Sequence, residues 1–159
     1  KALARAAEQL VASGGESMVA DQALRHIFSR VSDQGLIVEL FDLPDATLFV
    51  GDTDEPTILT IQLIKMIADI FQSTGNPIAV NGHVRARPIV ARSSSGWELS
   101  VRRAQKLRMM LVSSGLHEGR MERVAGWADR KPADLDPMSV RNNRVEIILL
   151  RSDRAATGK

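Results

Sequence analysis

The stretch Trp97-Glu98-Leu99-Ser100-Val101-Arg102-Arg103-Ala104 carries most of the structural information in this chain of 159 residues. It predicts the beginning of an amphipathic helix, because Arg103 lies four positions after Leu99 and three after Ser100, so that it shares one side of the helix with both. An arginine offers a fork of donors that suits a carboxylate, and the free backbone N–H groups of a helix N-terminus favour an anion as well. We therefore expect Arg103 to lie at the edge of a binding site.

The sequence on both sides of this helix alternates between helical and strand-like patterns. Ser95 and Glu98 form a capping box that starts the helix, and Asp52, Asp54 and Glu55 have the chemistry of acids at the N-terminus of an earlier helix. Glu39 is the single charged residue inside an otherwise apolar strand. Apolar spacing and turn residues predict helices over 1–12, about 17–32, about 53–72 and about 95–114, and strands over 36–41, 77–82, 121–127 and 144–150.

From residue 35 onward the predicted order is β-α-β-α-β-β. Strands joined by helical crossovers usually pair in parallel, and the last two strands are close enough in sequence to pair directly. The fold class is therefore α/β, an α+β sandwich with a mixed sheet of four or five strands and two helices on one face. We expect a helical extension or linker over residues 1–34, the domain over 35–151 and a flexible tail over 152–159.

The composition is that of an ordinary soluble domain, with 44% hydrophobic and 25% charged residues. The charge is unevenly distributed. Residues 1–77 hold 5 Lys/Arg and 11 Asp/Glu, whereas residues 78–159 hold 16 and 8. A basic second half suggests an anionic partner, such as nucleic acid, a membrane surface or an acidic cell-wall polymer, although arginines on a solvated face explain it equally well. The absence of cysteine excludes disulfides and thiolate metal sites.

Three segments together resemble the OmpA-like peptidoglycan-binding domain, in the form found in the MotB family of flagellar stator proteins. Gly82-His83 match the first half of the family's Gly-His-Thr-Asp, and Leu99 to Ala104 match Leu-Ser-x-x-Arg-Ala in full. The signature Asn-Arg-Arg-Val-Glu is matched except for Asn143, which stands at its middle arginine. Trp97-Glu98 and Phe41-Asp42 favour the stator branch of the family.

The resemblance implies a site for diaminopimelate, in which Arg103 takes a carboxylate and the aspartate of Gly-His-Thr-Asp takes the ammonium. Here Arg85 replaces that aspartate, and a cation cannot hold an ammonium group. The domain either uses another anchor, binds a more anionic ligand or has lost wall binding. A salt bridge from Arg103 to Glu98 or Glu146 is the structural alternative. The predicted peptidoglycan-binding residues are His83, Arg85, Leu99, Ser100, Arg103 and Arg144.

The resemblance also implies what the domain does. It predicts a non-enzymatic module in the periplasm that forms a homodimer and anchors a stator to peptidoglycan. The parent protein would have a transmembrane helix before Lys1, in the bacterial inner membrane, and a MotA-like channel partner. We expect no cofactor, no metal and no nucleic acid. The alternative is a dimerisation or docking module whose peptidoglycan binding has been lost or altered.

Overall fold

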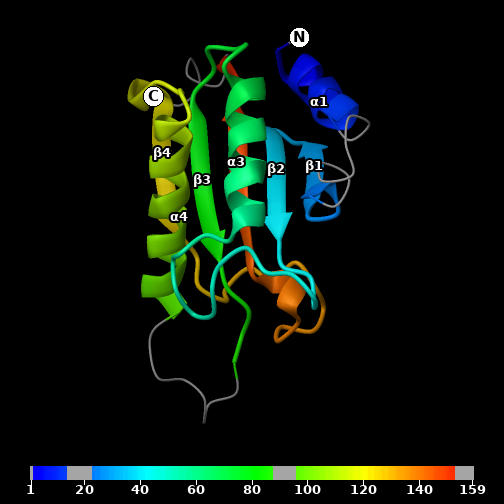
Figure 1. The fold of residues 1–159 in the computed structure, drawn as a ribbon, viewed down its shortest axis with the longest axis vertical. Coiled ribbons are helices and arrows are strands. Elements are labelled where there is room, and N and C mark those ends of the chain that lie inside the picture. The colour runs from blue at the N-terminus through cyan, green and yellow to red at the C-terminus, as the bar shows by residue number, and fades with distance from the viewer. Residues whose placement is uncertain (1, 14–22, 88–95, 153–159) are drawn as a thin grey trace.

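The structure is a computed structural model that describes residues 2–13, 23–87 and 96–152. Its five strands form one mixed sheet in the order β1-β2-β5-β3-β4 (Figure 1). The strands are β1 (Ile27–Val31), β2 (Gly35–Phe41), β3 (Ile78–His83), β4 (Met121–Gly126) and β5 (Arg144–Leu150). The helices are α1 (Ala2–Ser13), α3 (Ile58–Phe71) and α4 (Gly96–Ser113), with short 3₁₀ turns η2 (Glu118–Arg120) and η3 (Val140–Asn142). This confirms the predicted fold class. Within the described residues, none of the helices has the length and apolar character needed to cross a membrane.

The strand neighbours differ from the prediction in two respects. β3 and β4 pair in parallel through α4, as expected, but β2 and β3, which are joined through α3, do not pair with each other, and neither do β4 and β5. Instead β5 lies between β2 and β3 and is antiparallel to both. The reason is its composition: Ile147 and Leu149 are buried against the helices, and Ile148 is buried on the opposite face. A strand that is apolar on both faces is most stable at the centre of a sheet.

The predicted helix over 17–32 is wrong at its C-terminal end. Residues 27–31 form β1, an edge strand antiparallel to β2, whereas residues 17–22 lie outside the described residues. Ser32 and Gly35 exchange backbone hydrogen bonds of 2.8 and 3.2 Å and close a hairpin. Gly35 is required there because its φ is +145° and a Cβ would lie 2.1 Å from the carbonyl oxygen of Leu149. The predicted extension therefore contributes a strand to the sheet.

The helix α3 starts later than predicted. Its N-cap is Thr57, and no acid lies in its first turn. The residues expected to start the helix form a separate turn instead, in which Thr53 Oγ1 accepts a hydrogen bond of 3.1 Å from the backbone N–H of Glu55. An isolated bridge between Phe49 and Pro56 closes this turn at its base. Residues 50–55 are called the bridged turn below.

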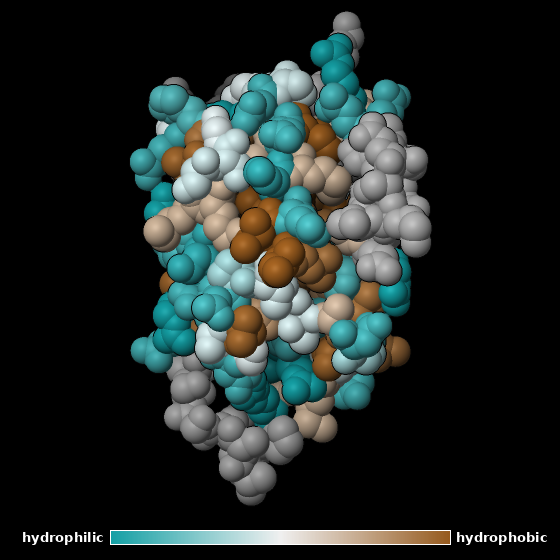
Figure 2. Space-filling view, viewed as in Figure 1, coloured by the Kyte–Doolittle hydropathy of each residue, from teal (hydrophilic) through white to brown (hydrophobic). Residues whose placement is uncertain are grey.

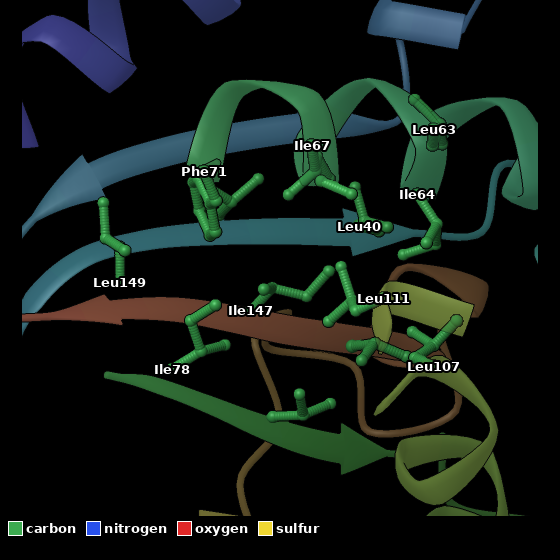
Figure 3. Close-up of a cluster of buried hydrophobic side chains, with 14 of the residues drawn as sticks. Leu40, Leu63, Ile64, Ile67, Phe71, Ile78, Leu107, Leu111, Ile147 and Leu149 are labelled. Atoms are coloured by element: carbon green, nitrogen blue, oxygen red, sulfur yellow. The ribbon is translucent and has the colours of Figure 1, made fainter. Parts of the chain in front are cut away.

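The main core lies between the sheet and the helices (Figure 3). α3 and α4 cover the same face of the sheet, and α1 packs beside α3 with Ala6 fully buried. Each fully buried Leu or Ile contributes about 1.5–3 kcal/mol relative to an exposed one, so this face supplies most of the stability. The largest fully buried side chains are Phe71, Leu36, Leu40, Leu48, Leu63, Ile64, Ile67, Ile78, Leu107, Leu111, Ile147 and Ile148.

Candidate functional site

One edge of the sheet gathers the segments that carry the sequence motifs. The C-terminal ends of β2 and β3 and the N-terminal end of α4 lie together at the lower end of the molecule in Figure 1. The start of β5 lies between them, since Arg144 is opposite both Phe41 and His83 in the strand register. This edge, with the bridged turn beside it, is the candidate site. Arg92 and Ser95 lie outside the described residues.

Arg103 is the most deeply buried of the three arginines predicted to bind peptidoglycan, with 5% of its surface exposed. Its Nε and Nη2 atoms each donate a hydrogen bond of 2.9 Å, to the carbonyl oxygens of Thr53 and Gly51. Its guanidinium carbon also lies 4.7 Å from the centre of the Phe49 ring. These donors go to the main chain and not to Glu98 or Glu146. Burial lowers the pKa of Arg103 to about 10, and the nearby charge of Asp42 opposes this shift. Arg103 therefore fastens the bridged turn.

Asp42 is the buried acid of the site. Its carboxylate accepts hydrogen bonds from the backbone N–H of Leu48 at 2.8 Å and from Asn143 Nδ2 at 3.1 Å. Burial raises its pKa, and both hydrogen bonds and the charge of Arg103 lower it. The sequence pointed to Phe41-Asp42 only as a family feature. In the structure Asp42 is the carboxylate that most favours the charge of Arg103.

Arg85 occupies the position where the family motif has aspartate. Its backbone N–H donates to Asn143 Oδ1 at 2.8 Å, and the backbone N–H of Ala86 donates to the carbonyl of Pro137 at 2.8 Å. The guanidinium makes a long hydrogen bond of 3.4 Å to the carbonyl of Met138, and its buried Nε has no hydrogen-bond partner. Among the described residues no carboxylate forms an ion pair with Arg85. Asn143, at the middle arginine of the family signature, links Arg85 to Asp42.

Arg87 and Asp52 form an ion pair that the sequence did not predict. Arg87 Nη1 donates a hydrogen bond of 2.7 Å to Asp52 Oδ2, and Nη2 contacts Oδ1. Asp52 was assigned to a helix N-terminus, but it lies in the bridged turn. Arg87 is not among the binding residues predicted from the sequence. No local pattern connects two residues 35 positions apart, so only the folded chain shows the pair.

Ser100 and Leu99 are buried where α4 meets the sheet. Ser100 Oγ donates to the carbonyl of Trp97 at 3.0 Å and accepts from the backbone N–H of Ala128 at 3.1 Å. A Cβ on Gly82 would lie 2.2 Å from the carbonyl oxygen of Ser100, so β3 and α4 approach each other at backbone distance. The Oγ contacts of Ser100 are therefore internal, and they hold the helix N-terminus against the strand ends.

His83 and Arg144 belong to a group on the sheet face opposite the helices, which we call the sheet-face cluster. His83 Nε2 lies 3.2 Å from Glu146 Oε1, and Arg144 Nε lies 2.9 Å from Glu39 Oε1. Arg141 also pairs with Glu39, and Asn81 donates to Glu146 at 3.3 Å. The cluster consists of Glu39, Asn81, His83, Arg141, Arg144 and Glu146.

The electrostatics of the sheet-face cluster are dominated by pairing. Burial alone would raise the pKa of Glu146, but the hydrogen bond and charge of His83, together with Arg144 and Asn81, hold it at about 2. Burial lowers the pKa of Arg144, and the two glutamates oppose that shift. The Nδ1 atom of His83 and the Nη1 atom of Arg144 are buried without a hydrogen-bond partner. The cluster is thus held together by its own charges.

Comparison with known proteins identifies the family. The OmpA family matches residues 52–146, which is more than half of the chain. Motility protein B of Escherichia coli K12 is 30% identical over 135 residues, covering 81% of this chain and 43% of that protein. The chain thus spans less than two thirds of the length of the curated relatives that it matches, from 41% to 60%.

Solved structures give the same fold. The periplasmic domain of MotB from Helicobacter pylori superimposes with a TM-score of 0.65 at 24% identity, covering 82% of this chain and 86% of that one. The cell wall anchor of the T6SS from Pseudomonas aeruginosa superimposes with a TM-score of 0.69 at 25% identity, covering 92% and 98%. The fold agrees with these solved structures, and the sequence matches the family over residues 52–146, which include the Leu-Ser-x-x-Arg-Ala helix. The chain belongs to the OmpA family.

Proposed function

We propose that this chain is a non-enzymatic anchoring module that binds the stem peptide of peptidoglycan at the sheet edge. Membership of the OmpA family supports the proposal, as do the similarities to Motility protein B and to a cell wall anchor. The observation that carries it is the arrangement of cations at this edge. Arg103 holds the bridged turn, Arg87 emerges beside it, and Arg85 has no ion-pair partner among the described residues.

The ligand group that fits this edge is a carboxylate. Arg85 and Arg87 both carry positive charge at this edge, and neither can hold an ammonium group. Asp42 is only 5% exposed and its carboxylate is directed to Leu48 and Asn143, so it does not replace the missing aspartate. In this proposal Arg85 contacts the ligand and Arg103 positions the bridged turn. The other predicted residues hold the surrounding strands and helix in place: Leu99, Ser100, His83 and Arg144. The domain would then bind a more anionic group than its relatives do.

The proposal extends to the protein from which this domain comes. A stator protein of this kind would lie in the inner membrane, with this domain in the periplasm as a homodimer and a MotA-like channel as partner. The positive charge of residues 78–159 suits an anionic wall polymer.

Retention on purified peptidoglycan sacculi tests the proposal. The full chain should co-sediment with sacculi, and Arg85→Glu should reduce the bound fraction at least about tenfold, since it places a like charge opposite the ligand carboxylate. Arg108→Gln is the matched control, because Arg108 is an arginine on α4 that pairs with Glu118 away from the edge. Retention that is unchanged by Arg85→Glu would reject the site, and no retention of the wild-type chain would reject the function.

The second candidate is a module that docks to a copy of itself without binding the wall. Apolar side chains gather on the helix-covered face (Figure 2), where Ile58 is 75% exposed and Ile61 is 46% exposed. Adjacent exposed isoleucines on one helix are typical of an interface. Sedimentation analysis separates the candidates: a dimer that Ile58→Lys dissociates, in a chain without affinity for sacculi, would favour docking alone.

A further inference from the structure

We propose that the carboxylate of Asp52 occupies the place of a ligand carboxylate, and that Arg87 is the residue that exchanges one for the other. The inference rests on the proposed function and names both the ligand group and its regulation. Neither residue is in the set of site residues predicted from the sequence. The chain would then carry its own competing anion at the edge of the sheet.

The geometry of the pair is that of ligand recognition. Both terminal nitrogens of Arg87 contact both oxygens of Asp52. This two-point contact is the way in which an arginine recognises a free carboxylate. The partners come from different connections, since Asp52 lies in the turn after β2 and Arg87 follows β3. The pair therefore links two segments that border the candidate site.

The bridged turn delivers Asp52 to this position and can remain in place when the side chain leaves. Gly51 and Thr53, on either side of Asp52, are both fixed through their carbonyl oxygens to Arg103. The backbone of Val50 and Glu55 closes the turn with a hydrogen bond of 2.9 Å. Rotation of the Asp52 side chain withdraws its carboxylate from Arg87 without moving the backbone of the turn. Arg103 thus acts as a positioning residue for the competing anion.

Exposure decides which arginine can exchange its partner. The side chains of Arg87 and Asp52 are 32% and 61% exposed, whereas Arg103 is 5% exposed and bound to the main chain. An exposed ion pair is worth up to about 1 kcal/mol, which corresponds to about a fivefold change in an equilibrium constant. A ligand carboxylate therefore displaces Asp52 at small cost, but it could replace the Arg103 contacts only by breaking the turn.

The test measures carboxylate binding and wall binding separately in the full chain. The variants are Asp52→Asn, Arg87→Gln and the double variant. Glu118→Gln is the matched control, because Glu118 forms a similar exposed pair with Arg108 at 2.9 Å. The probe for the subsite is N-acetyl-D-alanine, followed through the backbone amide NMR signals of Gly51 and Thr53, which every variant retains, with N-acetyl-D-alaninamide as the probe that lacks the carboxylate. The second assay is co-sedimentation with sacculi.

We expect Asp52→Asn to lower the Kd for N-acetyl-D-alanine and the Kd for sacculi by up to about fivefold. We expect Arg87→Gln to raise both of these dissociation constants at least about tenfold. In the Arg87→Gln background the Asp52 change should have no effect, and Glu118→Gln should have none in either assay. Retention of the wild-type chain on sacculi with no gain in Asp52→Asn overturns the inference while the proposed function stands. Amide signals of Gly51 and Thr53 that do not change with N-acetyl-D-alanine in Asp52→Asn also overturn it. A carboxylate-specific response without retention on sacculi supports the subsite and rejects the wall.

Discussion

The candidate site and the sheet-face cluster lie at the same edge of the sheet, and each compensates a buried arginine in a different way. Each buries an arginine from a sequence motif, Arg103 with 5% and Arg144 with 7% of its surface exposed. Arg103 is satisfied by the neutral carbonyls of Gly51 and Thr53. Arg144 forms an ion pair with the carboxylate of Glu39, and its buried Nη1 has no hydrogen-bond partner.

The difference separates two roles that the motifs do not distinguish. A buried arginine paired with a carboxylate is already neutralised, so His83 and Arg144 stabilise the sheet more than they attract a ligand. Arg103 is bound to neutral carbonyls and has no ion pair with a carboxylate among the described residues, so its positive field adds to that of Arg85. The motifs therefore mark one region that holds charges together and another that holds a turn in place beside the proposed ligand site. Substitutions in the two regions test this distinction.

Glu39→Ala should lower the free energy of unfolding by about 3–5 kcal/mol, because it leaves Arg144 buried without its partner and removes the ion pair of Arg141. Urea denaturation measures the loss. Replacing both Glu39 and Arg144 with Met should recover much of it, since apolar side chains avoid the cost of burying charge. A loss below about 1 kcal/mol for Glu39→Ala would show that the cluster is not held by pairing.

Acid should weaken the sheet-face cluster through Glu146. Its folded-state pKa of about 2 lies below its ordinary value of 4.5, so its stabilising contribution is complete above about pH 4.5 and is lost as the pH falls towards 2. The contribution amounts to about 3 kcal/mol. Urea denaturation at a series of pH values measures it, and Glu146→Gln should flatten the profile in that range. An unchanged profile would place the acid sensitivity elsewhere.

Arg103→Gln should cost about 2 kcal/mol, because two charge-assisted hydrogen bonds to the bridged turn are lost. The loss should be local: amide hydrogen exchange in residues 50–55 should become faster, while exchange in β5 changes little. The adjacent Arg102 is exposed, so Arg102→Gln is the matched control. Equal acceleration in β5 would mean that Arg103 supports the whole fold and not the turn.

Asp52→Asn should change the free energy of unfolding by less than about 1 kcal/mol, since its ion pair with Arg87 is exposed to solvent. Thermal unfolding of this variant beside Glu118→Gln measures the effect. A loss above about 2 kcal/mol would show that the pair holds the turn, which would move this region towards the behaviour of the sheet-face cluster.

Local sequence patterns predicted most helices and strands, but they did not predict most of the strand pairs. The apolar spacing in α3 and α4 and the β-branched run of β2 predicted these elements correctly. Ile27, Phe28 and Val31 fit both a helix and a strand, and only pairing with β2 decides between them. The consecutive apolar residues Ile147 and Ile148 were a usable signal for a central strand.

The candidate site was predicted only in part, because some of its residues can be recognised from the neighbouring sequence and others come together only in the folded chain. Arg103 follows from helix periodicity at a predicted N-terminus, and Arg85 follows from its position in the motif. Two other features depend on contacts between distant segments. Asn143 binds both Arg85 and Asp42, and Asp52 pairs with Arg87. Whether the predicted residues bind peptidoglycan stays a prediction that the sacculus experiments address.

The central position of β5 has a consequence for the order of folding. β5 is the last strand of the chain, yet β2 and β3 reach each other only through it. A chain ending before Arg144 would have two separate strand pairs, β1 with β2 and β3 with β4, and no continuous sheet. Because its closing contacts join residues far apart in sequence, the domain should fold slowly for its size. It should also fold only after its final strand has been synthesised.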